Sequence, residues 1–175
     1  MIRLDLDIDG IEAIVSTLQP SEKDAKIALK RALNKMAKWL STRTNRGLSK
    51  ELNLTQKILR RRLKKSSIIT TSTGLSIRLF YGLNDVALIH LNPKQTKTGV
   101  TASKRKVNGA FISKSKNQVF KRVGQERLPI EKQVDVIKQK ADSYLENTEF
   151  SSFEFQAQFL KILEHELKWQ MKWME

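Results

Sequence analysis

The sequence predicts an α+β fold in which a long N-terminal helix and C-terminal helices pack on an antiparallel sheet. Apolar residues recur at spacings of three and four over residues 25–40 and again after residue 131, which indicates amphipathic helices. Between these segments, β-branched and alternating residues from 68 to 123 indicate strands. A chain of 175 residues suffices for one hydrophobic core, so we expect a single domain spanning residues 1–175.

The N-terminal part is predicted to form a strand followed by the long helix. Residues 2–8 alternate between apolar and polar side chains, the period-two pattern of a half-buried strand. Ser21 supplies an N-cap and Asp24 a capping-box acid for a helix that begins here. Gly47 is placed to end this helix in a left-handed cap.

A short, strongly basic second helix is predicted to begin after Thr55, its N-cap residue. Leu54 and Leu59 are spaced as a hydrophobic staple, and Ile58 and Leu63 lie on the side expected to be buried. The outer face consists of Lys57, Arg60, Arg61, Arg62, Lys64 and Lys65. Because like charges at this density repel each other along a helix, we expect an acidic ligand or protein surface to compensate them.

The middle of the chain is predicted to contain strands and one exposed basic loop. Residues 68–81 have the pattern of a hairpin around Gly74, and residues 86–91 form a further strand. Residues 92–108 are rich in Thr and Lys with almost nothing to bury, so we expect a mobile basic loop.

The strands end near Pro129. Residues 109–113 and 118–123 are predicted to pair as strands, and Pro129 excludes its own segment from the centre of a sheet. A helix is then predicted from about residue 131, with Val134, Ile137, Ala141 and Leu145 on one face. Residues 149–174 are predicted to form a longer helix with two apolar stripes. The helix either packs between the sheet and the first long helix or provides a second partner surface.

The net charge of +15 is concentrated in the middle of the chain. Residues 41–127 contain 20 basic and 3 acidic side chains, whereas residues 1–40 have a net charge of +1 and residues 128–175 of −3. A segment this basic repels itself, and nucleic acid is the obvious polyanion to neutralise it. The alternative is a solvated basic surface without a ligand, because net charge alone speaks to solubility and nonspecific binding.

Residues suited to catalysis, metal binding or cofactor binding are scarce. The chain has no cysteine, which fits assembly inside a cell, and its two histidines, His90 and His165, lack a metal-binding spacing. The basic block contains only Glu51, Asp85 and Glu126, too few clustered carboxylates for a metal-dependent nuclease. We therefore predict that the protein is not an enzyme and uses no cofactor or metal, and that any nucleic acid is held through its phosphates.

Several stretches together resemble a known family. The first is Lys26-Ile-Ala-Leu-Lys-Arg-Ala-Leu-Asn-Lys-Met-Ala37, followed by the basic segment Lys57–Lys65. After the predicted loop come Gly109-Ala-Phe-Ile112, then Gln118-Val-Phe-Lys-Arg-Val-Gly124, then Arg127-Leu-Pro-Ile130. Their order and approximate spacing over residues 20–140 are similar to those of the minor tail protein Z family of lambda-like long-tailed phages.

This resemblance implies a structural virion protein of the phage tail, made in the cytoplasm of the bacterial host. It would complete the head-proximal end of the tail and enable head–tail joining, as a homo-oligomer for which we expect a hexameric ring around the DNA path. Its partners would be other tail and head–tail connector proteins, with genomic DNA contacted through phosphates and no membrane involved. The alternatives are a cellular, sequence-nonspecific nucleic-acid-binding protein and, more weakly supported, a nuclease.

The residues predicted to contact DNA or an acidic partner come from the basic helix and the basic loop. They are Lys57, Arg60, Arg61, Arg62, Lys64, Lys65, Lys94, Lys97, Lys104, Arg105 and Lys106. Aromatic residues are few in this region, so base-specific recognition is not predicted.

Overall fold

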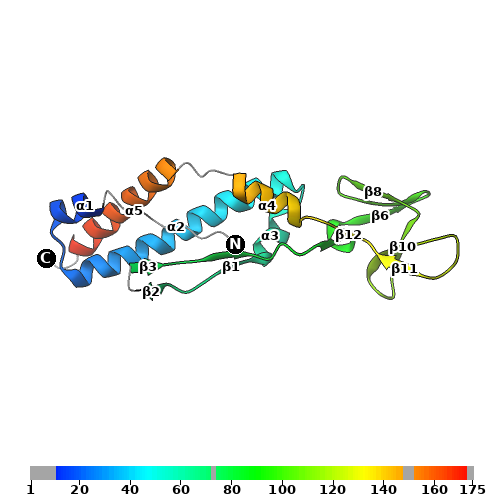
Figure 1. Cartoon of the computed structure of the whole chain (residues 1–175), viewed down its shortest axis with the longest axis horizontal. Coiled ribbons are helices and arrows are strands. Elements are labelled where there is room, and N and C mark those ends of the chain that lie inside the picture. The colour runs from blue at the N-terminus through cyan, green and yellow to red at the C-terminus, as the bar shows by residue number, and fades with distance from the viewer. Residues whose placement is uncertain (1–10, 72–73, 148–151, 173–175) are drawn as a thin grey trace. The chain divides into compact units, whose positions relative to one another are not determined.

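The computed structural model describes residues 11–71, 74–147 and 152–172 (Figure 1). Over these residues the chain consists of helices and antiparallel sheets, which confirms the α+β class. It divides into two compact units: unit 1 is Met1–Arg46, Arg60–Gly82 and Leu145–Glu175, and unit 2 is Gly47–Leu59 and Leu83–Tyr144. The strand predicted at residues 2–8 lies outside the described residues. That residues 1–175 form a single domain stays a prediction.

Two N-terminal helices open the described chain, α1 (Ile11–Leu18) and the long α2 (Glu22–Glu51). The predicted cap of α2 is confirmed: Asp24 N donates to Ser21 Oγ at 3.2 Å, and the Ser21 hydroxyl donates to the Asp24 carboxylate. These bonds satisfy backbone and side-chain groups that the first helical turn leaves free.

The predicted end of α2 at Gly47 is wrong, because the helix continues to Glu51. Gly47 lies within the helix where Tyr144 comes close, and a Cβ at this position would lie 1.7 Å from the Tyr144 hydroxyl oxygen. The chain instead turns at Asn53, whose φ of 49° is left-handed. Leu54 N then donates to Ser49 O at 3.2 Å, and the Ser49 hydroxyl donates to Leu54 O at 2.6 Å. The glycine therefore provides space for a tyrosine and does not end the helix.

The core of unit 1 is formed by α2 and the C-terminal helix α5 (Ser152–Lys172), which lie side by side in Figure 1. The buried residues are Ala28, Ala32, Leu33 and Met36 of α2 with Phe155, Phe159, Leu163 and Leu167 of α5. The four residues of α5 recur every four positions and form one stripe of the helix. Packing of this helix on the first long helix is thus confirmed, whereas Trp169 is 42% exposed and a second partner surface stays a prediction.

A hairpin contributes the strands of unit 1. Strand β1 (Leu63–Lys65) pairs with β4 (Leu79–Tyr81), and β2 (Ile69–Thr71) pairs with β3 (Gly74–Ser76), both antiparallel. The predicted hairpin around Gly74 is therefore confirmed. Leu79 is buried with Ala37 and Leu40 of α2, so the hairpin packs on this helix.

Unit 2 begins with the end of α2 and the first residues of a short helix, up to Leu59, and continues from Leu83 into small sheets. Strand β5 (Val86–Ala87) pairs with β12 (Val134–Asp135) and leads into the 3₁₀ helix η1 (Leu88–Leu91), so the strand predicted over 86–91 is only two residues long. Helix α4 (Lys138–Asn147) begins later than predicted, because the residues from Ile130 to Asp135 form strands.

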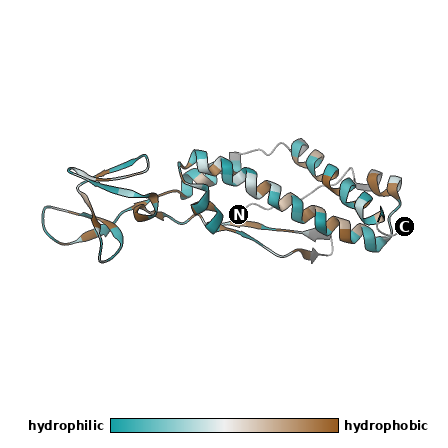
Figure 2. Ribbon diagram, turned by 180° about the vertical axis from the view of Figure 1, so that it is seen from behind, coloured by the Kyte–Doolittle hydropathy of each residue, from teal (hydrophilic) through white to brown (hydrophobic). Residues whose placement is uncertain are grey.

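The predicted loop 92–108 is wrong. This segment forms a three-stranded antiparallel sheet of β6 (Pro93–Thr96), β7 (Gly99–Ala102) and β8 (Arg105–Asn108), joined by two-residue turns. In Figure 2 these strands are largely teal, the colour of hydrophilic residues. The segment therefore has a fixed register, although its sequence has few apolar residues.

A second three-stranded sheet follows, in the order β11–β10–β9. Strands β9 (Ala110–Ser113) and β10 (Gln118–Arg122) form the predicted pair, and β11 (Ile130–Lys132), next to Pro129, lies at the edge. The pairing is antiparallel as predicted, but the described strands form five small sheets in place of one. Among the described residues, no helix is long and apolar enough to span a membrane.

Candidate polyanion-binding surfaces

Helix α3 (Gln56–Arg62) presents the basic run predicted from the sequence. Ile58 N donates to Thr55 O at 3.0 Å, so the helix begins where the N-cap was predicted, and Leu59 on its inner side is 1% exposed. Lys57, Arg60 and Arg61 are exposed. Like charges repel along such a short helix, so nearby anions would stabilise it.

The last basic residue of α3 has a structural contact. Arg62 is half-buried, and its Nη1 donates to the backbone oxygen of Gly82 at 3.2 Å, next to the β1–β4 pair. Its backbone oxygen accepts a bond of 2.9 Å from Gly82 N. Arg62 therefore helps to hold the base of the hairpin.

Lys64 and Lys65, predicted on the basic helix, lie on strand β1. Because successive side chains of a strand point to opposite faces, these two lysines separate. Lys65 Nζ donates to Asn34 Oδ1 of α2 at 2.9 Å, whereas Lys64 lies opposite Phe80, which is 51% exposed. Of the two, Lys64 has the more accessible position for an external ligand.

The β6–β7–β8 sheet has one face turned to the interior of unit 2. Val100 and Ala102 on this face are fully buried, and the sheet contacts η1 and β9. Gln95 lies in register with Val100 but is itself exposed. Its Nε2 donates to Gly99 O at 2.9 Å and to Ala110 O at 3.2 Å, and its Oε1 accepts a bond of 2.9 Å from Ile112 N.

The other face of this sheet is basic. Lys94 of β6 pairs with Thr101 of β7, and Thr101 pairs with Lys106 of β8, so the three side chains form a row across the strands that we call the lysine row. Both lysines are exposed. Neighbouring strands lie about 4.8 Å apart, which places the two lysine Cα atoms roughly 10 Å from each other. The same face carries Thr96 and Asn108 and no carboxylate.

The two turns of the sheet add further exposed cations. Lys97 lies in the turn between β6 and β7, and Lys104 in the turn between β7 and β8. The predicted loop lysines are thus exposed, but a rigid sheet positions them.

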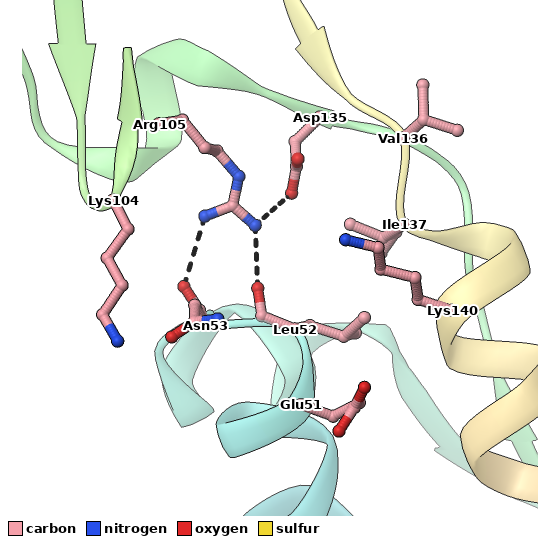
Figure 3. Close-up of a pocket in the computed structure, with 9 residues that line it drawn as sticks. All are labelled: Glu51, Leu52, Asn53, Lys104, Arg105, Asp135, Val136, Ile137 and Lys140. Atoms are coloured by element: carbon pink, nitrogen blue, oxygen red, sulfur yellow. Dashed lines mark hydrogen bonds and ion pairs between the residues drawn. The ribbon is translucent and has the colours of Figure 1, made fainter.

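Arg105 is engaged with other groups of unit 2 (Figure 3). Its Nη2 donates to Leu52 O at 2.7 Å and forms an ion pair with the Asp135 carboxylate, and its Nη1 donates to Asn53 O at 3.4 Å. The backbone oxygens at the end of α2 carry partial negative charge, which favours a guanidinium at this position. Arg105 thereby joins β8, β12 and the end of α2.

A polar cavity of about 220 Å³ surrounds this arginine. Its charged lining consists of Glu51, Lys104, Arg105, Asp135 and Lys140. The carboxylates lie among cations, and the described residues contain no group of three His, Cys, Asp or Glu side chains that could hold a metal ion. The cavity has the composition of an ion-pair network around a structural arginine.

One surface was not predicted from the sequence, and it lies on the outer face of β9–β10–β11. Phe111 and Phe120 are cross-strand partners with ring centroids 6.2 Å apart. The Arg122 guanidinium carbon lies 5.9 Å from the centroid of Phe111, and the Lys116 ammonium nitrogen lies 5.9 Å from that of Phe120. We call these four residues and Lys132, which pairs with Phe120, the aromatic–basic face. The available signal was two phenylalanines in neighbouring predicted strands, with Lys114 directly after the first strand and Lys121 and Arg122 near the end of the second.

The charge is unequal between the units. Unit 2 contains 15 basic and 6 acidic side chains, a net charge of +9, and unit 1 contains 18 and 12, a net charge of +6. In unit 2, the half-buried Arg105 pairs with Asp135, and the other lysines and arginines are exposed. Unit 2 therefore has the stronger positive potential per residue.

Comparison with known proteins gives no match: no protein-family model, no curated protein and no solved structure matches this chain. Function is therefore inferred from the residues and surfaces described above.

Proposed function

We propose that this protein is a structural virion component that completes the head-proximal end of a phage tail and enables head–tail joining. It would act as a ring, hexameric by expectation, around the DNA path. The proposal is supported by the order of the sequence stretches that resemble the minor tail protein Z family and by the α+β fold of helices and antiparallel sheets. Its partners would be neighbouring tail and connector proteins.

The single observation that supports contact with DNA is the lysine row on the β6–β7–β8 sheet. The buried face of that sheet fixes the register, so Lys94 and Lys106 keep their spacing without a ligand. Such lysines neutralise phosphates regardless of base sequence, and this suits a protein past which DNA of any sequence moves. The hydroxyl of Thr101 between them adds a phosphate hydrogen-bond donor.

The test is the assembly of phage particles without this chain. The proposal predicts DNA-filled heads and separate, finished tails in negative-stain electron microscopy, because only the joining step is lost. Supplying the wild-type chain from a plasmid should restore joined particles. Normal virions in the absence of the chain would overturn the proposal.

The second candidate is a cellular, sequence-nonspecific nucleic-acid-binding protein. The lysine row favours it equally, since phosphate neutralisation requires no virion. The genes on either side distinguish the two candidates: head and tail genes support the virion component, and their absence supports the cellular protein.

A further inference from the structure

The outer face of the β9–β10–β11 sheet combines aromatic rings with cations. The two sides of β10 differ sharply: Val119 is fully buried and pairs with Ile112, whereas Phe120 is only half-buried and pairs with Phe111. The core of unit 2 thus lies behind the sheet at Val119. The two phenylalanines lie on the opposite face, where both remain partly accessible to solvent.

The cations around the rings lie on three sides. Lys116 comes from the β9–β10 turn, Arg122 from the far end of β10 and Lys132 from the edge strand β11. The remaining side chains of this face, Ser113, Gln118 and Ile130, add no carboxylate, because Glu131 pairs with Lys121 on the other face. A polyanion would meet only attractive charges here.

We propose that this aromatic–basic face binds single-stranded nucleic acid, with bases stacking on Phe111 and Phe120 and phosphates contacting Lys116, Arg122 and Lys132. Every base has a π-face, so stacking on phenylalanine is independent of sequence. In a duplex, the bases stack on one another and expose only their edges and the phosphates, so this face selects single strands.

The contacts already present on the rings do not prevent binding. An exposed cation–π contact contributes a factor of about two to five in an equilibrium constant, whereas one base stacked on an aromatic side chain contributes about five- to 150-fold. A base that displaces a cation from a ring is therefore favoured overall, and the displaced lysine or arginine remains within reach of the adjacent phosphate.

The experiment compares two labelled oligonucleotides of about 12 units, within the length that such sites cover. One is oligothymidylate and the other is an abasic strand with the same number of phosphates, and fluorescence anisotropy gives the affinity of the full chain for each. We expect oligothymidylate to bind at least about tenfold more tightly, because the abasic strand cannot stack. Equal affinities, or no binding of either strand, would overturn the proposal.

Variants of the phenylalanines test whether the higher affinity for oligothymidylate depends on their rings. Phe120→Leu keeps an apolar side chain of similar size and should lower oligothymidylate affinity about fivefold or more while leaving abasic affinity unchanged. Phe120→Tyr keeps the ring and should bind as the wild type does. Phe80→Leu, at an exposed phenylalanine of unit 1, is the matched control and should have no effect. An equal loss in Phe120→Leu and Phe80→Leu, or an equal loss of both oligonucleotides in Phe120→Leu, would contradict stacking on this face.

This inference is separate from the proposed role in the tail. The aromatic–basic face shares no residue with the lysine row. Its test measures the difference in binding affinity between oligothymidylate and the abasic strand. Joined particles in the absence of the chain would overturn the tail proposal alone, and equal binding of the two strands would overturn this one alone.

Discussion

At the residue scale, Arg105 differs from the other cations predicted to contact DNA. Its side chain is about one-fifth exposed and lies between the Asp135 carboxylate and the backbone oxygens of Leu52 and Asn53. Its neighbour Lys104 is exposed in the turn before β8. The same positive charge therefore has a structural role at one position and is free to meet a ligand at the next.

We predict that Arg105→Gln lowers the free energy of unfolding by about 2 kcal/mol. Hydrogen bonds to a charged group contribute about 1.5–3 kcal/mol, and partial exposure reduces the loss when one partner is removed. Urea denaturation followed by circular dichroism measures the change. Lys104→Gln is the control and should stay within about 0.5 kcal/mol of the wild type. If both variants are equally stable, Arg105 does not anchor the end of α2.

The role of Gly47 could not be predicted from the residues next to it in the sequence. A glycine near the end of a helical pattern favours a left-handed cap, and that prediction was wrong because the reason for the glycine lies almost one hundred residues away at Tyr144. Ser21 and Thr55 were predicted correctly, since a cap depends only on the next three or four residues.

At the scale of the elements, the segments whose apolar residues recur with a clear period were predicted correctly, and the segments without such a period were not. Helices α2 and α5 and the β9–β10 pair follow the spacing of their apolar residues. The β6–β7–β8 sheet lacks such a signal, because few large apolar residues are buried in it: Val100 and Ala102 are buried, and the exposed Gln95 joins the sheet to β9 by hydrogen bonds. Its register depends on contacts with β9 and η1 that no local pattern reveals.

The lysine row gives a prediction for duplex DNA. Replacing Lys94 and Lys106 together by Gln should weaken binding to any sequence and reduce the slope of log K against log salt by about 2, one unit for each lost phosphate contact. Fluorescence anisotropy with a labelled duplex at several NaCl concentrations measures the slope.

The control for the lysine row removes the same charge from α2, at the exposed residues Lys23 and Lys38. Because these lysines lie in the better balanced unit 1, the slope of this double variant should stay close to that of the wild type. If the slope falls equally in the two double variants, the net charge of the chain, and not the lysine row, determines binding.

At the scale of the whole molecule, both units are positive, with net charges of +6 and +9. In any homo-oligomer these charges come close together, and their repulsion opposes assembly unless counterions or a polyanion screen them. A ring around DNA would have its counterion in the lumen. The net charge that limits self-association in free solution would then favour assembly on nucleic acid.

We therefore predict that oligomerisation of the purified chain increases with salt. Raising NaCl from 0.1 to 1 M shortens the screening length from about 10 to about 3 Å, which weakens repulsion between subunits while apolar contacts persist. Sedimentation velocity should show a larger oligomeric fraction at 1 M than at 0.1 M, and a short duplex added at 0.1 M should have the same effect by neutralising the charge directly. A fraction that falls with salt would indicate that ion pairs between subunits hold the oligomer, and the basic surfaces would then face acidic neighbours in the assembly in place of DNA.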